Sequence, residues 1–272
     1  MSIKGWFKFV VTTFVLMCAF GIVYFMPNLD VKPAVTTQFP NKIQPIKTPI
    51  TNLPNVIQKT IPSVVHIKAS AGWQGSGFII AEDIIVTARH CVEDGGNFTI
   101  TYNDGHKTTT NKSIYSKKYD VGFIKIESPI DIKLKPVTFG DVRKCKLGQF
   151  VFIIGSPLGD RHFNSVSFGI ISNLDLSLES KGCPDSMGWS LLWMTDAASY
   201  GGSSGSPVFG LDGVVYGVLV GGYGDFESTS YCVPVYQFAN DLENIKLLFA
   251  LDKYQVEKEK EEPVYVYMEQ VK

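Results

Sequence analysis

Short apolar runs, separated by glycine and polar turn residues, occupy the chain from about residue 57 to about residue 240. The runs that we interpret as strands are 64–68, 77–80, 84–87, 98–102, 121–126, 151–154, 165–171, 214–220 and 231–235. The dipeptide Asp104-Gly105 is a hairpin signal, because glycine adopts positive φ without a steric penalty. Many short strands with turn signals between them are typical of a β-sandwich or a β-barrel. The pattern therefore predicts an all-β fold.

The last apolar pattern has the period of a helix. Four apolar residues recur at steps of three and four positions, namely Phe238, Leu242, Ile245 and Phe249. This spacing predicts an amphipathic C-terminal helix over residues 236–251 that packs on the β domain. A charged tail over 252–272 follows. Valine and tyrosine alternate at 264–267, and we keep open the alternative that this segment adds a strand to the edge of a sheet.

The N-terminal part of the chain contains an uncharged run over residues 9–26, preceded by Lys4 and Lys8. As a helix this run is about 27 Å long at about 1.5 Å per residue. That length is just enough to cross a bilayer, and the flanking lysines keep the N-terminus cytoplasmic. We therefore predict a transmembrane signal anchor at 1–26, with an extracytoplasmic domain, periplasmic or extracellular, beyond it.

A cleaved signal peptide is the alternative, since Ala19-Phe20-Gly21 is a tolerable cleavage site, and the domain is then secreted. Residues 27–54 hold six of the 14 prolines of the chain, so they build neither a helix nor a central strand. We interpret 27–55 as a semi-extended linker that reaches at most about 90 Å at about 3.1 Å per residue.

Charge and cysteine content exclude several classes of function. The chain has 272 residues with 25 basic and 26 acidic side chains, so it has no basic surplus for nucleic acid. Its five cysteines form no C-x-x-C pair. We therefore expect no nucleic-acid partner, no metal ion and no cofactor.

Three separated residues together indicate nucleophilic catalysis. His90 follows a predicted strand, Asp120 opens another, and Ser204 lies in a glycine-rich loop over 202–207. A serine hydroxyl is a weak nucleophile unless an imidazole removes its proton and a buried carboxylate orients that imidazole. We therefore predict a catalytic triad of His90, Asp120 and Ser204.

The glycines around Ser204 have a separate explanation. Two backbone N–H groups, expected from Gly202 and Ser204, must converge on the oxyanion that develops during acyl transfer. That convergence needs backbone conformations that side chains hinder, and glycine relieves the hindrance. We therefore predict an oxyanion hole at Gly202 and Ser204.

Several motifs occur together and in a set order: Pro62-Ser63-Val64-Val65, Gly75-Ser76-Gly77-Phe78, Gly155-Ser156-Pro157-Leu158-Gly159, Thr195-Asp196-Ala197-Ala198 and Gly202-Ser203-Ser204-Gly205-Ser206-Pro207. With these motifs, roughly residues 56–245 resemble a chymotrypsin-fold (trypsin-like) serine protease of the HtrA/Deg type. Residues 206–209 also resemble the glutamyl endopeptidases, a neighbouring branch.

The resemblance implies two six-stranded antiparallel β-barrels, about 60–130 and about 145–240, within a protease domain over 56–251. It implies that His90 and Asp120 come from the first barrel and Ser204 from the second. The few residues after the terminal helix are too short for the PDZ domain typical of the family, so we expect none.

The oxyanion loop departs from the family pattern. Ser203 stands where the family usually has Asn or Asp, and Tyr200-Gly201 replaces a pair that resembles Asn-Pro. Loss of a proline removes a restriction on φ. We therefore hypothesise that this loop is mobile at rest and that substrate binding orders it.

The remaining cysteines, histidines and acids have simpler interpretations. We expect Cys91 to be a buried free thiol, while a bridge between Cys145 and Cys183 stays open. His66 alternates with apolar neighbours beside Lys68 and is expected at the surface. His162 is expected in a loop that touches substrate or solvent, and Asp196 in a structural role.

The resemblance places the base of the substrate pocket near Ala198, Ser199 and Tyr200, with Leu219 and Val220 on its wall. Without an acid there, a basic substrate side chain is left unpaired in a low-dielectric slot. Glutamyl endopeptidases carry a histidine where Leu219 stands. We therefore expect a small or medium aliphatic residue on the acyl side of the cut.

The interpretation that combines these features is a membrane-tethered serine endopeptidase, which acts on proteins or peptides in quality control or processing. Two alternatives stay open, a catalytically silent binding module and a dedicated processing protease for a single partner. The sequence leaves the oligomeric state undetermined.

Overall fold

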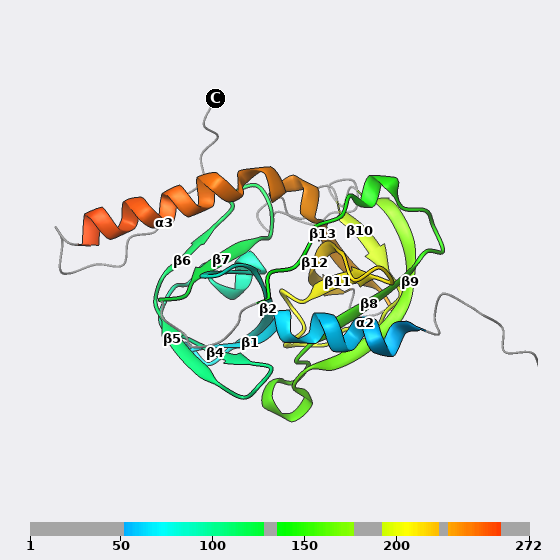
Figure 1. The fold of residues 1–272 in the computed structure, drawn as a ribbon, viewed down its shortest axis with the longest axis horizontal. Helices are drawn as coiled ribbons and strands as arrows, with labels where there is room; N and C mark the ends of the chain where they lie inside the picture. Colours follow the sequence, from blue (N-terminus) through cyan, green and yellow to red (C-terminus); the bar gives the residue numbers. More distant parts are fainter. Residues whose placement is uncertain (1–51, 128–134, 177–191, 223–227, 257–272) are drawn as a thin grey trace, which may run out of the picture. The chain divides into compact units, whose positions relative to one another are not determined.

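The computed structural model describes residues 52–127, 135–176, 192–222 and 228–256 (Figure 1). The predicted anchor, most of the linker, Cys183 and the segment 264–267 lie outside these residues. Within the described ranges, no helix is both long enough and apolar enough to cross a membrane.

The first half of the described chain forms one antiparallel sheet of seven strands in the order β5-β4-β1-β2-β3-β7-β6 (Figure 1). Its strands are β1 (Val64–Ala69), β2 (Gln74–Ala81), β3 (Ile84–Thr87), β4 (Phe98–Tyr102), β5 (Lys107–Thr110), β6 (Ser113–Tyr115) and β7 (Gly122–Lys125). Ile67, Ile79, Ile85 and Ile100, from four neighbouring strands, are fully buried in one cluster. The alternating β-branched residues of the sequence thus form the inner face of this sheet.

This sheet differs from the predicted closed six-stranded barrel. Its edge strands are β5 and β6, and Thr110 at the end of one is three residues before Ser113 at the start of the other. Three residues span at most about 10 Å, so the sheet must curl until its edges approach each other. No ladder joins the described strands β5 and β6, so the structure has an open sheet of seven short strands where a closed barrel of six was predicted.

The second half forms a closed barrel in the order β10-β13-β12-β11-β8-β9, with β9 pairing back to β10. Its strands are β8 (Phe150–Gly155), β9 (Ser165–Leu176), β10 (Leu192–Thr195), β11 (Pro207–Gly210), β12 (Val215–Gly222) and β13 (Ser230–Pro234). Trp193, Val208 and Leu219 fill its interior. The predicted second six-stranded barrel is therefore confirmed.

A shared apolar core joins the sheet to the barrel. One cluster contains Phe78 and Phe123 from the sheet together with Phe152, Phe209 and Val218 from the barrel, all fully buried. The rings of Phe152 and Phe209 stack at 5.2 Å between centroids. Because protein interiors are close-packed, this cluster holds the two β structures in a defined relation.

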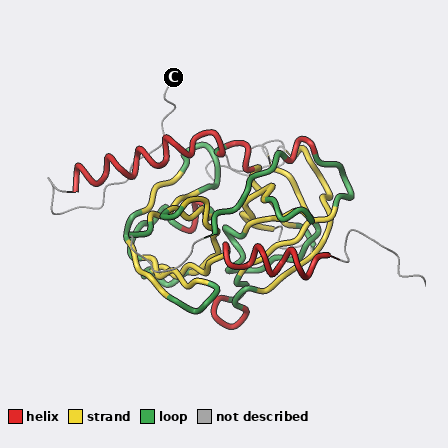
Figure 2. The backbone as a smooth tube through the Cα atoms, viewed as in Figure 1, coloured by secondary structure: helices red, strands yellow, loops and turns green. Residues whose placement is uncertain are grey.

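Within the described part of the chain, the α-helices α2 (Leu53–Thr60) and α3 (Leu242–Val256) lie outside the β structures (Figure 2). The predicted C-terminal helix is present, but it begins at Leu242 and not at residue 236. Two 3₁₀ turns occupy the residues before it, and between them Phe238 packs edge-on against Phe123 and Phe139. The docking of this ring explains why the regular helix begins later.

His66 is buried, so its predicted surface position is wrong. Its side chain is 1% exposed, because the 3₁₀ turn η5 (Gly159–His162) of the second half covers the outer face of β1. The imidazole Nδ1 lies 3.3 Å from Asp160 Oδ1, and the ring meets Phe163 edge-on. Burial lowers the pKa of His66, and attraction to Asp160 opposes this only in part.

A lowered pKa makes the buried His66 a source of pH-dependent stability. The unfolded chain takes up a proton near the ordinary histidine pKa of about 6.5, whereas folded His66 resists protonation. Stability from this residue is therefore present above pH of about 6.5 and is lost as the pH falls below it, by at most about 1.4 kcal/mol per pH unit. Thermal unfolding should show that His66→Phe loses less stability than the wild type between pH 8 and pH 5.

The exposed His106 of the hairpin turn provides a matched control, since His106→Gln should keep the wild-type pH dependence. Equal pH dependence in His66→Phe and the wild type would contradict the assignment.

Candidate active site

His90 and Asp120 form a close pair at the end of β3. His90 lies in the 3₁₀ turn η3 (Arg89–Cys91), and its Nδ1 is 2.9 Å from Asp120 Oδ2 and 3.1 Å from Oδ1. The backbone N–H of His90 also donates to Asp120 Oδ1 at 3.1 Å. Asp120 is 1% exposed, whereas the imidazole keeps a third of its surface in solvent. The carboxylate therefore fixes the ring from the inside through Nδ1, while part of the ring faces solvent.

This pairing also determines the electrostatics of the imidazole. Burial by itself lowers the pKa of His90, but the hydrogen bonds to Asp120 and Cys91 and the charge of Asp120 outweigh it and raise the pKa. The dominant cause of the rise is the buried carboxylate, which stabilises the imidazolium form. The carboxylate thus stabilises the charged form that the ring reaches when it takes up a proton.

The loop that carries Ser204 packs directly against the first sheet. The Ser204 carbonyl accepts a hydrogen bond from Ser76 N–H at 2.7 Å and lies 4.0 Å from the Sγ atom of Cys91, the residue after His90. Ser204 itself is partly exposed, and its hydroxyl has no hydrogen bond to any described residue. The structure thus brings the Ser204 backbone to the same junction as His90 and Asp120.

The backbone around Ser204 orients two N–H groups. The Gly201 carbonyl accepts from Leu158 N–H at 2.8 Å, and the Ser203 carbonyl accepts from Ser206 N–H at 3.0 Å. Because a trans peptide is planar, the N–H groups of Gly202 and Ser204 point away from these donors. Within the described residues neither N–H has a backbone acceptor, so both are available to a ligand.

The loop around Ser204 is hydrogen-bonded to its surroundings in this structure, and the hypothesis that it is mobile at rest stays a prediction. Gly202 has φ of +96°, and Ser203 N–H closes a turn onto the Tyr200 carbonyl at 2.8 Å. The contact from Leu158 N–H restrains the Gly201–Gly202 peptide where the family has a proline. A hydrogen bond from a distant segment therefore restrains this peptide, in place of the limit on φ that a proline ring sets locally.

The predicted pocket residues lie beside this loop in different environments. Ala198 and Tyr200 are exposed, and Ser199 shares a hydrogen bond of 2.8 Å with Ser230. The side chains of Leu219 and Val220 are buried in the apolar clusters of the barrel. Their side chains therefore belong to the core, so any contribution of these two residues to a pocket wall comes from their backbone.

The other residues singled out from the sequence are also located. Among the described residues, Cys91, Cys145 and Cys232 are buried free thiols, which confirms the expectation for Cys91. The bridge left open between Cys145 and Cys183 is not tested, because Cys183 lies outside the described residues. His162 is exposed in η5. Asp196 accepts a hydrogen bond from Ile170 N–H at 2.6 Å, in line with a structural role.

The sequence reasoning missed Ser76 and Leu158, which both bond to the loop around Ser204. The available signal was their position in the motifs at 75–78 and 155–159. A motif marks the resemblance to a family, but it does not by itself reveal which distant backbone groups its residues contact.

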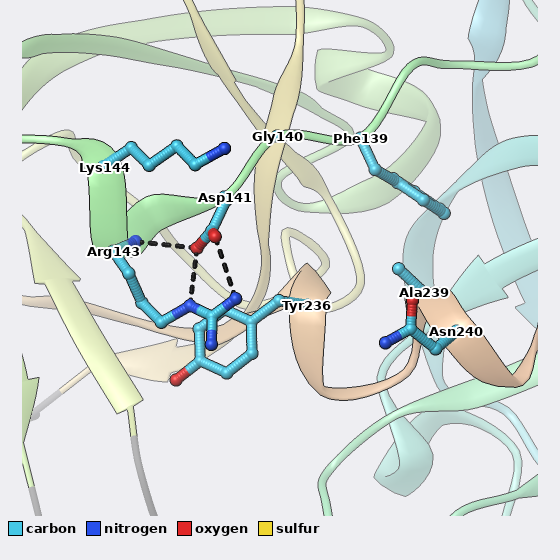
Figure 3. A pocket seen from close by; sticks show the side chains of 8 residues that line it. All are labelled: Phe139, Gly140, Asp141, Arg143, Lys144, Tyr236, Ala239 and Asn240. Carbon is cyan, nitrogen blue, oxygen red and sulfur yellow. Dashed lines mark hydrogen bonds and ion pairs between the residues drawn. The ribbon is translucent and has the colours of Figure 1, made fainter.

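A separate hollow of about 540 Å³ is lined by residues of two segments, 139–144 before β8 and 236–240 before α3 (Figure 3). Arg143 forms a two-point ion pair with Asp141 there and stacks over Tyr236 at 4.3 Å. None of the predicted site residues lines this hollow, so it is distinct from the junction that holds His90 and Ser204.

Comparison with known proteins identifies the family. A family model described as "Trypsin-like peptidase domain" matches residues 75–218, which is more than half of the chain. The match spans His90, Asp120 and Ser204. The chain therefore belongs to the trypsin-like peptidase family.

Curated relatives point to one branch of this family. The chain is 35% identical over 165 residues to a "Probable periplasmic serine endoprotease DegP-like" of Halomonas elongata, with 59% of this chain and 32% of the relative covered. A protein of the same description from Chlamydia trachomatis is 32% identical over 165 residues, with 59% and 31% covered. The chain thus spans about a third of the length of these relatives.

Solved structures agree on the fold. "HtrA-type protease AlgW with tripeptide" matches with a TM-score of 0.61 at 20% identity, covering 71% of this chain and 63% of that chain. "Crystal structure of Rv3671c protease, inactive form" matches with a TM-score of 0.59 at 25% identity, covering 73% and 96%. The resemblance to the HtrA/Deg type inferred from the motifs is confirmed.

The geometry of the pair makes a prediction about the charge of His90. Asp120→Asn removes the carboxylate that stabilises the imidazolium, so the pKa of His90 should fall by about one unit or more. Titration of the His90 ring by NMR measures this directly, with Asp104→Asn on the hairpin turn as a control. A His90 titration unchanged by Asp120→Asn would show that the carboxylate does not control this histidine.

Proposed function

We propose that the protein is a serine endopeptidase that hydrolyses peptide bonds through His90, Asp120 and Ser204. The observation that carries the proposal is the oriented His90–Asp120 pair at the same junction as Ser204, whose loop directs two free N–H groups outward. Membership of the trypsin-like peptidase family supports the same chemistry.

The first chemical step follows from the positions of these groups. Ser204 Oγ attacks the carbonyl carbon of the scissile bond, while His90 removes the hydroxyl proton. Asp120 holds the imidazole in the required tautomer and stabilises the imidazolium that forms. The N–H groups of Gly202 and Ser204 donate to the oxyanion, and one such donor is typically worth about 10²–10³ in rate.

The second half of the reaction uses the same residues. His90 returns its proton to the leaving amine, which departs and leaves an acyl-enzyme on Ser204. Water then attacks the acyl group with His90 as base, and the acid product leaves with the serine restored. Every proton is thus moved by His90, and Asp120 stabilises the imidazolium that forms each time the ring accepts one.

We further propose that the protease domain acts outside the cytoplasm and is tethered to the membrane by residues 1–26. The apolar run with Lys4 and Lys8 before it supports the tether. The description of the curated relatives as periplasmic endoproteases supports the location. We propose that the substrates of this tethered domain are exposed or unfolded segments of proteins.

A fluorophosphonate probe tests the proposed nucleophile in the full chain, purified in detergent. The wild type should be labelled covalently, whereas Ser204→Ala and His90→Ala should lose labelling by about 10³-fold or more, because the triad acts as a unit. Ser70→Ala and His106→Gln change an exposed serine and an exposed histidine and should label like the wild type. A folded wild type without labelling would instead favour the silent binding module.

The pocket residues predict the cleavage preference. Ala198, Ser199 and Tyr200 supply no charge to pair with a basic or acidic substrate side chain, and an unpaired charge is costly in a slot of low dielectric. A peptide library analysed by mass spectrometry should therefore show Val, Ala or Leu on the acyl side of the cut. A profile dominated by Arg, Lys or Glu would refute this specificity while leaving the triad intact.

A further inference from the structure

Ser76 of β2 connects two loops of the second barrel through one hydroxyl group. The side chain is fully buried, and its Oγ donates to the Gly202 carbonyl at 2.8 Å and accepts from Ser156 N–H at 2.9 Å. A carbonyl only accepts and an N–H only donates, so these two partners fix the direction of the hydroxyl proton. The hydroxyl thus uses its donor on one loop and an acceptor lone pair on the other.

The backbone of Ser76 reinforces this connection. Its N–H donates to the Ser204 carbonyl at 2.7 Å, and its carbonyl accepts from Thr87 Oγ1 at 2.7 Å. A methyl group on Gly205 would come within 2.1 Å of the Ser76 carbonyl oxygen. β2 is therefore in direct contact with the loop on both sides of the nucleophile.

The second partner of the hydroxyl, Ser156, begins the turn that orients the first oxyanion donor. Gly159 N–H closes this turn onto the Ser156 carbonyl at 2.9 Å, and Leu158 N–H donates to the Gly201 carbonyl at 2.8 Å. Leu158 has φ of 57°, a left-handed conformation that a branched side chain adopts only when its surroundings hold it. The orientation of the Gly201–Gly202 peptide therefore depends on the position of this turn.

The turn and the oxyanion loop meet without intervening side chains. A methyl group on Gly202 would come within 2.7 Å of the Ser156 carbonyl oxygen and 3.1 Å of the Leu158 nitrogen. Backbone in such close contact transmits a displacement directly, since no flexible side chain absorbs it. A shift of the turn at Ser156 would consequently move the N–H of Gly202.

We propose that Ser76 is a positioning residue for the oxyanion hole, which it controls by holding the oxyanion loop at Gly202 and the supporting turn at Ser156 with one hydroxyl. This role rests on the proposed protease function. Ser76 acts through Gly202 and Leu158 and does not itself touch the substrate.

The test compares Ser76→Ala with the wild type in the full chain, purified in detergent, using a peptide with an aliphatic residue on the acyl side. Loss of the hydroxyl leaves Ser156 N–H and the Gly202 carbonyl unpaired, so the donors at Gly202 and Ser204 lose their alignment. The expected result is a fall in kcat of about 10- to 100-fold, with KM changed by less than about threefold. Ser76→Cys, with a weaker donor of similar size, should give an intermediate kcat.

A second measurement separates positioning from general destabilisation. A peptide boronate forms a tetrahedral adduct with the serine, whereas the corresponding peptide amide binds only as a ground state. Ser76→Ala should weaken binding of the boronate by about the factor lost in kcat and leave binding of the amide nearly unchanged. Thr60→Val in α2 is the matched control, because it removes a buried hydroxyl that donates to the Val56 carbonyl at 3.0 Å. Its kcat and its boronate affinity should equal those of the wild type.

The outcomes distinguish this proposal from the proposed function. If the wild type cleaves the peptide and folded Ser76→Ala and Ser76→Cys keep the wild-type kcat and boronate affinity, the positioning role is overturned and the protease function stands. Parallel loss of amide and boronate binding would also overturn it, since that pattern reports a general change of the site. If the wild type neither cleaves nor binds the boronate, the proposed function fails, and the role of Ser76 fails with it.

Discussion

The packing of the curled sheet against the closed barrel is the constraint on which the rest of the structure depends. Phe78 and Phe123 on one side and Phe152 and Phe209 on the other belong to a single buried cluster. Burial of apolar surface in this cluster is non-directional, but close packing allows only one arrangement of these rings. The arrangement places His90 and Asp120, from the sheet, next to the loop of Ser204, from the barrel.

Apolar packing brings the sheet and the barrel together, and hydrogen bonds across the junction fix the orientation of the loop around Ser204. Ser76 bonds through its side chain and its backbone to the loop of Ser204, and Leu158 fixes the peptide before Gly202. These contacts join groups that are buried or partly buried, where an unpaired donor or acceptor is costly. The geometry that hydrolysis requires is therefore maintained by the same interactions that make the junction stable.

Burial by itself lowers the pKa of both His66 and His90, but the net shifts of the two are opposite. At His90 a buried carboxylate lies within hydrogen-bond distance, and the net effect is a raised pKa. At His66 the nearest carboxylate belongs to the exposed Asp160, so desolvation dominates and the pKa is lowered. The difference lies in the partner and its own burial, which the local sequence around each histidine does not reveal.

The sequence by itself determined the features that depend on neighbouring residues or on short motifs. Short apolar runs between glycine and polar turns predicted the strands, and the placement of His90, Asp120 and Ser204 predicted the class of chemistry. Only the tertiary structure decided that η5 buries His66, that Phe238 packs against Phe123 before α3 begins, and that Leu158 N–H bonds to the Gly201 carbonyl. The physical reason is that strand periodicity and turns arise from local sterics, whereas these three contacts join segments far apart in the chain. Such contacts exist only once the sheet and the barrel have packed together.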